Sequence, residues 1–125
     1  MKKKQPEKKL QEACLEIAGL SECFNAFPVD INPVPGGGKL DWRIAGYPDL
    51  LIVGYREDRQ FHVELKIGRN GLNRKQKTWH ARYKAVNGSA FVCRTTLEFA
   101  EVLLSKAREY GWRDQRLELI RVGLQ

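Results

Sequence analysis

The chain has 125 residues, the length of one domain, with 42% hydrophobic and 30% charged residues, which excludes a disordered tail. No apolar run approaches the about 20 residues that a membrane-spanning helix needs, so we expect no membrane contact. The net charge of +7 either attracts a polyanion such as a nucleic acid or serves only solubility. We expect a single globular domain over residues 1–125, with a basic N-terminal extension at 1–5.

A helix over residues 7–20 is the first element that the sequence predicts. Apolar side chains recur there at spacings of three and four, on one helical face: Leu10, Ala13, Cys14, Ile17 and Ala18. A short strand is expected within 21–27. Prolines and glycines then interrupt regular structure, most densely at 33–39. A loop of that length is either functional or a plain surface connector, and we leave both readings open.

Two strand-like runs near the middle of the chain predict a β-hairpin. Residues 49–55 and 60–67 are rich in β-branched and aromatic side chains, and the charged segment 56–59 separates them as a turn. A second, polar turn is expected at 68–71.

Capping residues predict the helices of the second half. Asn73 can begin a helix that runs to about Val86, where Gly88 would end it. A strand is expected over 90–94, and Thr95 begins the next helix with a capping-box signature.

The tail at 112–125 fits a short strand or a helix, and its pattern does not decide between them. Before that tail, the order is helix, strand, strand, strand, helix, strand, helix. This order predicts an α/β fold with a small central mixed sheet flanked by helices.

The cysteines indicate a reducing compartment. They are odd in number, widely spaced and without C-x-x-C spacing, which argues against a disulfide framework and a zinc site: Cys14, Cys23 and Cys93. No apolar segment follows the basic start, so we expect no secretory signal and a cytoplasmic location.

Two acids and a lysine lie on the hairpin. Asp49 stands at the start of one strand, while Glu64 and Lys66 alternate with apolar neighbours on the other. Alternate side chains of a strand share a face, so pairing of the strands brings the three together. Two carboxylates beside a cation are suited to Mg²⁺-assisted attack on a phosphodiester.

The pattern resembles the PD-(D/E)xK nuclease superfamily and, within it, the VRR-NUC family of virus-type replication-repair nucleases. The residues that carry the resemblance are Gly46-Tyr47-Pro48-Asp49-Leu50, then Val63-Glu64-Leu65-Lys66, then Leu72-Asn73 with Gln76 and Trp79, led by an N-terminal helix with Glu7, Leu10 and Gln11. The likeness covers about residues 7–104. It implies a restriction-endonuclease-like core around the small mixed sheet.

The resemblance also implies a role for individual residues. Asp49, Glu64 and the backbone carbonyl of Leu65 would bind Mg²⁺ or Mn²⁺. Lys66 would activate the attacking water, and Gln76 would contact the scissile phosphate or the metal-bound water. Glu7 matches the N-terminal acid of the family. It would either support a metal-bound water or be only a solvated helix acid.

The activity implied is endonucleolytic hydrolysis of DNA, in a phage or bacterial setting. The loop at 33–39 lies where the family varies, so no substrate preference carries over from it. A stand-alone domain would select branched DNA such as four-way junctions by forming a homodimer, which is a hypothesis. Two alternatives remain: a nucleic-acid-binding module that does not cut, and a structural protein with a nuclease-like scaffold.

Several residues around this set have a structural and a functional interpretation. Cations follow the second strand, where they either contact phosphates or are merely solvated: Arg69, Arg74, Lys75, Lys77, Arg82 and Lys84. His62 and His80 are expected to be packed or surface histidines, without zinc-site spacing. Trp79 and Tyr83 are expected to be core side chains rather than base-stacking platforms.

Overall fold

The computed structural model describes residues 5–29, 46–57 and 59–125. The loop at 33–39 lies outside them, as does the expected extension apart from Gln5, which belongs to the first helix. The elements in chain order are α1 (Gln5–Leu20), β1 (Phe24–Pro28), β2 (Leu50–Gly54), β3 (Gln60–Leu65), α2 (Arg74–Ala85), β4 (Ala90–Cys93), α3 (Thr96–Glu109) and α4 (Gln115–Leu124). In this part of the chain, none of the helices has the length and apolar character required to cross a membrane.

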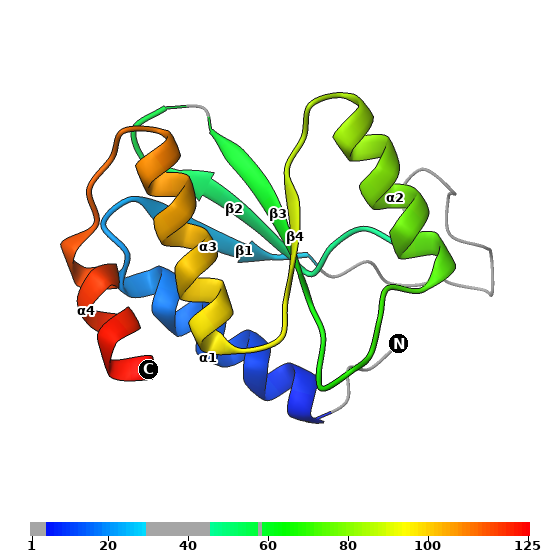
Figure 1. The fold of residues 1–125 in the computed structure, drawn as a ribbon, viewed down its shortest axis with the longest axis horizontal. Coiled ribbons are helices and arrows are strands. Elements are labelled where there is room, and N and C mark those ends of the chain that lie inside the picture. Colours follow the sequence, from blue (N-terminus) through cyan, green and yellow to red (C-terminus); the bar gives the residue numbers. More distant parts are fainter. Residues whose placement is uncertain (1–4, 30–45, 58) are drawn as a thin grey trace.

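The strands of the described residues form one mixed sheet in the order β1-β2-β3-β4 (Figure 1). The expected hairpin is confirmed, because β2 and β3 pair antiparallel with Leu50 opposite Val63. β3 and β4 are parallel, as a strand–helix–strand connection through α2 requires. The expected α/β class, a small mixed sheet flanked by helices, is therefore confirmed.

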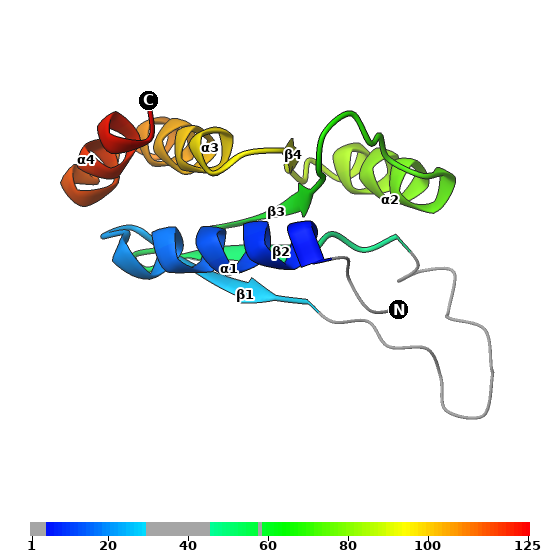
Figure 2. The same cartoon turned by 90° about the horizontal axis from the view of Figure 1, so that it is seen from below.

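One face of the sheet forms the main core with α1 and α3 (Figure 2). The odd-numbered side chains of β3 lie on this face. There Phe61 packs edge to face against Phe24, with 5.5 Å between the ring centroids. The three cysteines are buried free thiols. Burial raises the pKa of both Cys14 and Cys93 to about 12, so these thiols are not ionised.

The opposite face of β3 is buried as well, which the alternation of polar and apolar residues did not indicate. His62 is 2% exposed and Glu64 3% exposed. Helix α2, which stands apart from the other helices in Figure 1, covers this face. Its Trp79 ring contacts His62, and its Gln76 side chain contacts Glu64. The polar face of β3 is thus part of a second buried region, which contains both polar and aromatic side chains.

Helix α2 ends where the sequence predicts, with Val86 as its C-cap, but the end of β3 and the residue that terminates α2 differ from the expectation. β3 ends at Leu65 rather than at residue 67, although the amide of Lys66 still donates to the Cys93 carbonyl at 3.0 Å. Helix α2 ends through Asn87, which adopts the left-handed conformation at φ 64°. Gly88 follows it and donates its N–H to the Tyr83 carbonyl at 2.9 Å. A Cβ on Gly88 would lie 2.5 Å from the Tyr83 ring, so glycine serves close packing there.

The undecided tail is helix α4, held by one buried carboxylate. Asp114, 2% exposed, caps α4 by accepting the amide of Leu117 at 3.0 Å. It also accepts the hydroxyl of Ser21 at 2.6 Å and the amide of Glu22 at 3.0 Å. These hydrogen bonds join the C-terminal helix to the turn between α1 and β1.

Candidate functional site

The hairpin register places Asp49 beside the middle of the Glu64-Leu65-Lys66 segment. Continuing the pairing of Leu50 with Val63 by one residue sets Asp49 opposite Glu64. The carboxylate of Asp49 accepts the amide of Leu65 through Oδ2 at 2.8 Å. In an extended strand, the N–H and C=O of one residue point to the same side. The carbonyl of Leu65 therefore points toward the side that carries the Asp49 carboxylate.

The close approach of the segment before Asp49 to α2 requires a glycine. Gly46 has φ 83°, and a Cβ there would lie 2.3 Å from the carbonyl oxygen of Lys75, in the first turn of α2. After it, Pro48 is fully buried and the carbonyl of Asp49 accepts the amide of Val29 at 2.8 Å. The backbone on both sides of the Asp49 carboxylate is thus held in place.

Gln76 joins the buried Glu64 to the start of α2. Its Nε2 donates to Oε1 of Glu64 at 2.8 Å. Its Oε1 accepts the amide of Asn73, and the Asn73 side chain accepts the amide of Gln76, both at 2.9 Å. These last two bonds form a reciprocal capping box. The amide orientation follows from the contacts, because the oxygen caps the helix while the nitrogen binds the carboxylate.

Lys66 and Glu7 complete the expected set. Lys66 is half-buried and has the strand parity of Glu64, so both side chains leave the backbone toward the α2 face. Glu7 belongs to a different element, the first turn of α1, where it is also half-buried. A carboxylate at that position is favoured by the helix dipole alone. The structure therefore joins Asp49 to Leu65 and Gln76 to Glu64, sets the two acids opposite each other in the hairpin, and has Lys66 follow Leu65 in the chain. The position of Glu7 has a sufficient structural reason.

An aromatic cluster beside this set was not predicted as a unit. The hydroxyl of Tyr47 lies 2.6 Å from Nε2 of His62, whose ring also meets Trp79 and Tyr83 at 5.1 and 4.7 Å between centroids. Burial lowers the pKa of His62 to about 4 and raises that of Tyr47. At neutral pH a neutral phenol therefore shares a hydrogen bond with a neutral imidazole. The signals in the sequence were the spacing of Trp79 and Tyr83 and the shared parity of His62 and Glu64.

The oxygen atoms of this site are of the kind that a hard divalent cation prefers. They are two carboxylates and a backbone carbonyl, from Asp49, Glu64 and Leu65. A carboxylate has about four lone-pair positions, so accepting the hydrogen bonds from Leu65 and Gln76 does not prevent it from binding a cation. The described residues contain no group of three or more His, Cys, Asp or Glu side chains placed to hold a metal. A cation here would thus depend on backbone or water oxygens as well.

Comparisons of the chain with family models, with curated proteins and with solved structures found no match.

Proposed function

We propose that this protein is a metal-dependent endonuclease that hydrolyses DNA phosphodiester bonds, with a VRR-NUC-like PD-(D/E)xK core. The observation that carries the proposal is the hydrogen bond from the Leu65 amide to the Asp49 carboxylate. It holds one acid against the backbone between the other acid, Glu64, and Lys66. These two acids and the lysine all belong to one β-hairpin.

The ion in this proposal is Mg²⁺ or Mn²⁺. Asp49, Glu64 and the Leu65 carbonyl would hold it, with Glu7 contributing through water at most. The chemistry that such an ion would supply is polarisation of a phosphate oxygen and a lower pKa of its bound water. A dication between two neighbouring carboxylates also offsets their mutual repulsion, which is strong where water is excluded.

The chain itself supplies orientation and positive charge. Lys66 holds the attacking water and stabilises the charge that develops on the phosphate. Gln76 orients the Glu64 carboxylate through the 2.8 Å bond from its amide nitrogen. Since that amide is also part of the helix cap, the orientation is built before substrate arrives.

The substrate in this proposal is DNA, with selectivity for branched forms such as four-way junctions. Selectivity of that kind would arise in a homodimer with two active sites, within a bacterial cell or a phage-infected one. Helix α2 provides a surface for the DNA backbone, because it carries no acid and its exposed cations follow one another: Arg74, Lys75, Lys77, Arg82 and Lys84.

The same cations favour a second candidate function, a nucleic-acid-binding module that does not cut. A basic helix without acids binds phosphates whether or not a metal site operates beside it. The two candidates differ in what Lys66 does, since binding through α2 does not need it.

Cleavage of defined DNA distinguishes the two candidates. Linear, flapped and four-way DNA are incubated with the protein in Mg²⁺, in Mn²⁺ and in EDTA. We expect metal-dependent products that disappear in Lys66→Ala while gel-shift binding is retained. Arg108→Ala, which removes an exposed cation from the last turn of α3, is the matched control and should cut normally. Retarded but intact DNA under every condition would establish the binding module.

A further inference from the structure

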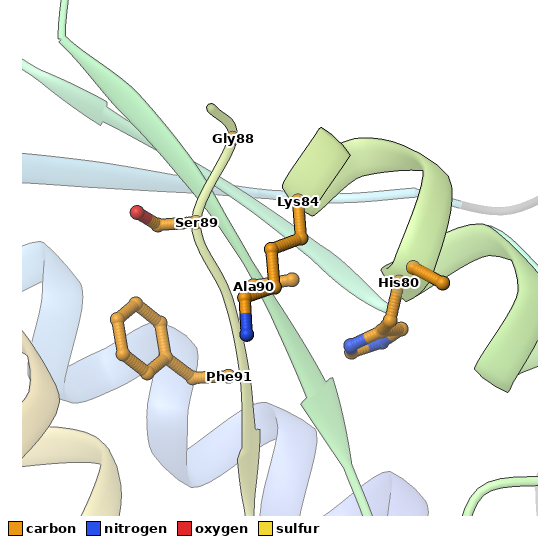
Figure 3. Close-up of a pocket in the computed structure, with 7 residues that line it drawn as sticks. His80, Lys84, Gly88, Ser89, Ala90 and Phe91 are labelled. Atoms are coloured by element: carbon orange, nitrogen blue, oxygen red, sulfur yellow. The ribbon is translucent and has the colours of Figure 1, made fainter. Parts of the chain in front are cut away.

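A cavity of about 410 Å³ lies at the free edge of the sheet, away from the acids. It is bounded by residues 80–84 of α2 and by residues 88–91, which lead into β4 (Figure 3). Cavities of this size accommodate a small organic ligand rather than a single ion. The residues that line it include a lysine and a histidine and no acid.

Two side chains of α2 that carry nitrogen atoms line this cavity. Figure 3 shows the Lys84 side chain extending over Ala90, with the His80 ring on the same side of the strand. Nε2 of His80 is buried and has no hydrogen-bond partner among the described residues. Burial lowers the pKa of His80, so the ring is neutral at pH 7 and carries one N–H. A buried polar nitrogen without a partner is costly, and a ligand oxygen would satisfy it.

The backbone of β4 adds a third donor. The amides of His62 and Lys66 bind the carbonyls of Ser89 and Cys93, so the odd-numbered residues of β4 direct their polar groups toward β3. In a parallel ladder the even-numbered residues of β4 direct their N–H and C=O groups away from β3. The N–H of Ala90 therefore points to the open edge of the sheet, beside the cavity.

The remaining surroundings favour an anion with an organic part. Lys106 is only 7% exposed, and its Nζ donates to the hydroxyl of Ser89, which lines the cavity, at 3.1 Å. The Lys106 ammonium also forms an ion pair with Glu109, with 3.0 Å between Nζ and Oε2. Apolar surface from Phe91 and Ala81 lines the rest. A sulfate-sized ion would leave this apolar surface uncovered.

We propose that this cavity binds a phosphate group together with its sugar, with Lys84, the His80 ring and the Ala90 amide as donors to the phosphate oxygens. The source of that unit is a nucleic-acid backbone or a free nucleotide, which share this chemistry. Helix and strand edge provide the donors without any carboxylate that would repel the ligand.

A consequence for catalysis rests on the nuclease proposal. Gln76 and Lys84 are eight residues apart on α2, which corresponds to about 12 Å along the helix axis. Successive phosphates of one DNA strand are about 3.4 Å apart along the duplex axis. The bound phosphate would then lie within a few nucleotides of the cleaved bond. Lys84→Ala would raise KM for DNA severalfold and leave kcat unchanged.

The two histidines of the chain allow a direct test by NMR. The ¹H–¹⁵N correlations of the imidazole rings are followed in EDTA while inorganic phosphate, deoxyadenosine monophosphate or a short DNA duplex is added. We expect saturable shifts of the His80 signals with each ligand and stationary His62 signals. Stronger binding of the duplex than of the nucleotide identifies a nucleic-acid backbone as the source; the reverse identifies a free nucleotide.

Matched variants complete the test. Lys84→Ala should weaken phosphate binding about tenfold, because it removes a charge-assisted donor. Lys9→Ala removes an exposed lysine from α1 and should leave the titration unchanged. His80 signals that stay still with every ligand, or that shift equally in Lys84→Ala, would overturn the proposal. No cleavage is measured, so loss of the nuclease function in another assay does not affect this result.

Discussion

The hydroxyl of Tyr47 and Nε2 of His62 lie 2.6 Å apart, and this hydrogen bond joins the segment before Asp49 to the centre of β3. The bond lies within the aromatic cluster under α2, with Tyr47 and Trp79 ring centroids 4.9 Å apart. Its position indicates that the cluster supports the site by fixing the approach of residues 46–49.

Removing the phenol hydroxyl tests that support. Tyr47→Phe leaves the buried His62 ring without its hydrogen-bond partner, which should lower the free energy of unfolding by about 1–2 kcal/mol. Urea denaturation at pH 7 measures the change. Tyr55→Phe is the matched control, because Tyr55 is 58% exposed, and its effect should stay within about 0.5 kcal/mol. Equal effects of the two substitutions would contradict the role given to the Tyr47 hydroxyl.

Stability should fall in mild acid because of His62. Its pKa is about 4 in the folded protein and about 6.5 when unfolded, so the unfolded chain binds more protons between these values. The free energy of unfolding should therefore decrease by roughly 3 kcal/mol as the pH falls from 7 to 4. The groups that face the ring are Tyr47, Trp79 and Tyr83, with His80 nearby on α2.

The measurement for His62 is denaturant unfolding at several pH values, with His62→Asn as the comparison. The variant is expected to be less stable at pH 7 but to lose less stability on acidification. The pKa of His80 is also lowered by burial, so His80→Asn is needed as a second comparison. An acid dependence unchanged in His62→Asn would show that other groups cause it.

A conservative change at Asp49 separates metal binding from folding. In Asp49→Asn the side-chain oxygen can still accept the Leu65 amide, so basal stability should change little. The lost charge should abolish the rise in Tm that Mg²⁺ produces in the unaltered protein by binding its folded state. Differential scanning fluorimetry with and without Mg²⁺ measures both. A full Mg²⁺ response in Asp49→Asn would exclude this carboxylate as a ligand.

The buried Asp114 should be the most important capping residue of the chain. Asp114→Ala leaves the Ser21 hydroxyl and two amides without their acceptor, so a loss of about 2–4 kcal/mol is expected. Chemical denaturation followed by circular dichroism measures it. Glu118→Ala, in the first turn of the same helix but exposed, should cost far less. Similar losses for both would mean that the contact with Ser21 contributes nothing.

Local signals in the sequence were sufficient for most elements. The three-and-four spacing of apolar residues predicted α1, and the side chains of Asn73 and Thr95 cap α2 and α3 as expected. The hairpin spacing predicted the pairing of β2 with β3, from which the proximity of Asp49 and Glu64 follows. These features depend on residues within one helix turn or one hairpin, which is why the sequence reveals them.

Contacts between distant elements could not be predicted in this way. The bond of Gln76 with Glu64 depends on where α2 docks, and that of Tyr47 with His62 depends on the path of the chain before β2. The tail could not be assigned because its helix is stabilised by a contact between Asp114 and Ser21, 93 residues apart. Long-range packing, rather than intrinsic propensity, decided these cases.

The double use of the Gln76 side chain has a consequence for how this protein responds to heat. Helix α2 contains no buried residue, so it belongs to the least protected part of the fold. When the first turn of α2 unfolds locally, the side-chain amide of Gln76 no longer donates its hydrogen bond to Glu64. The proposed activity would then be lost at temperatures below the melting temperature of the rest of the protein. The first turn of α2 would set the upper temperature limit of that activity.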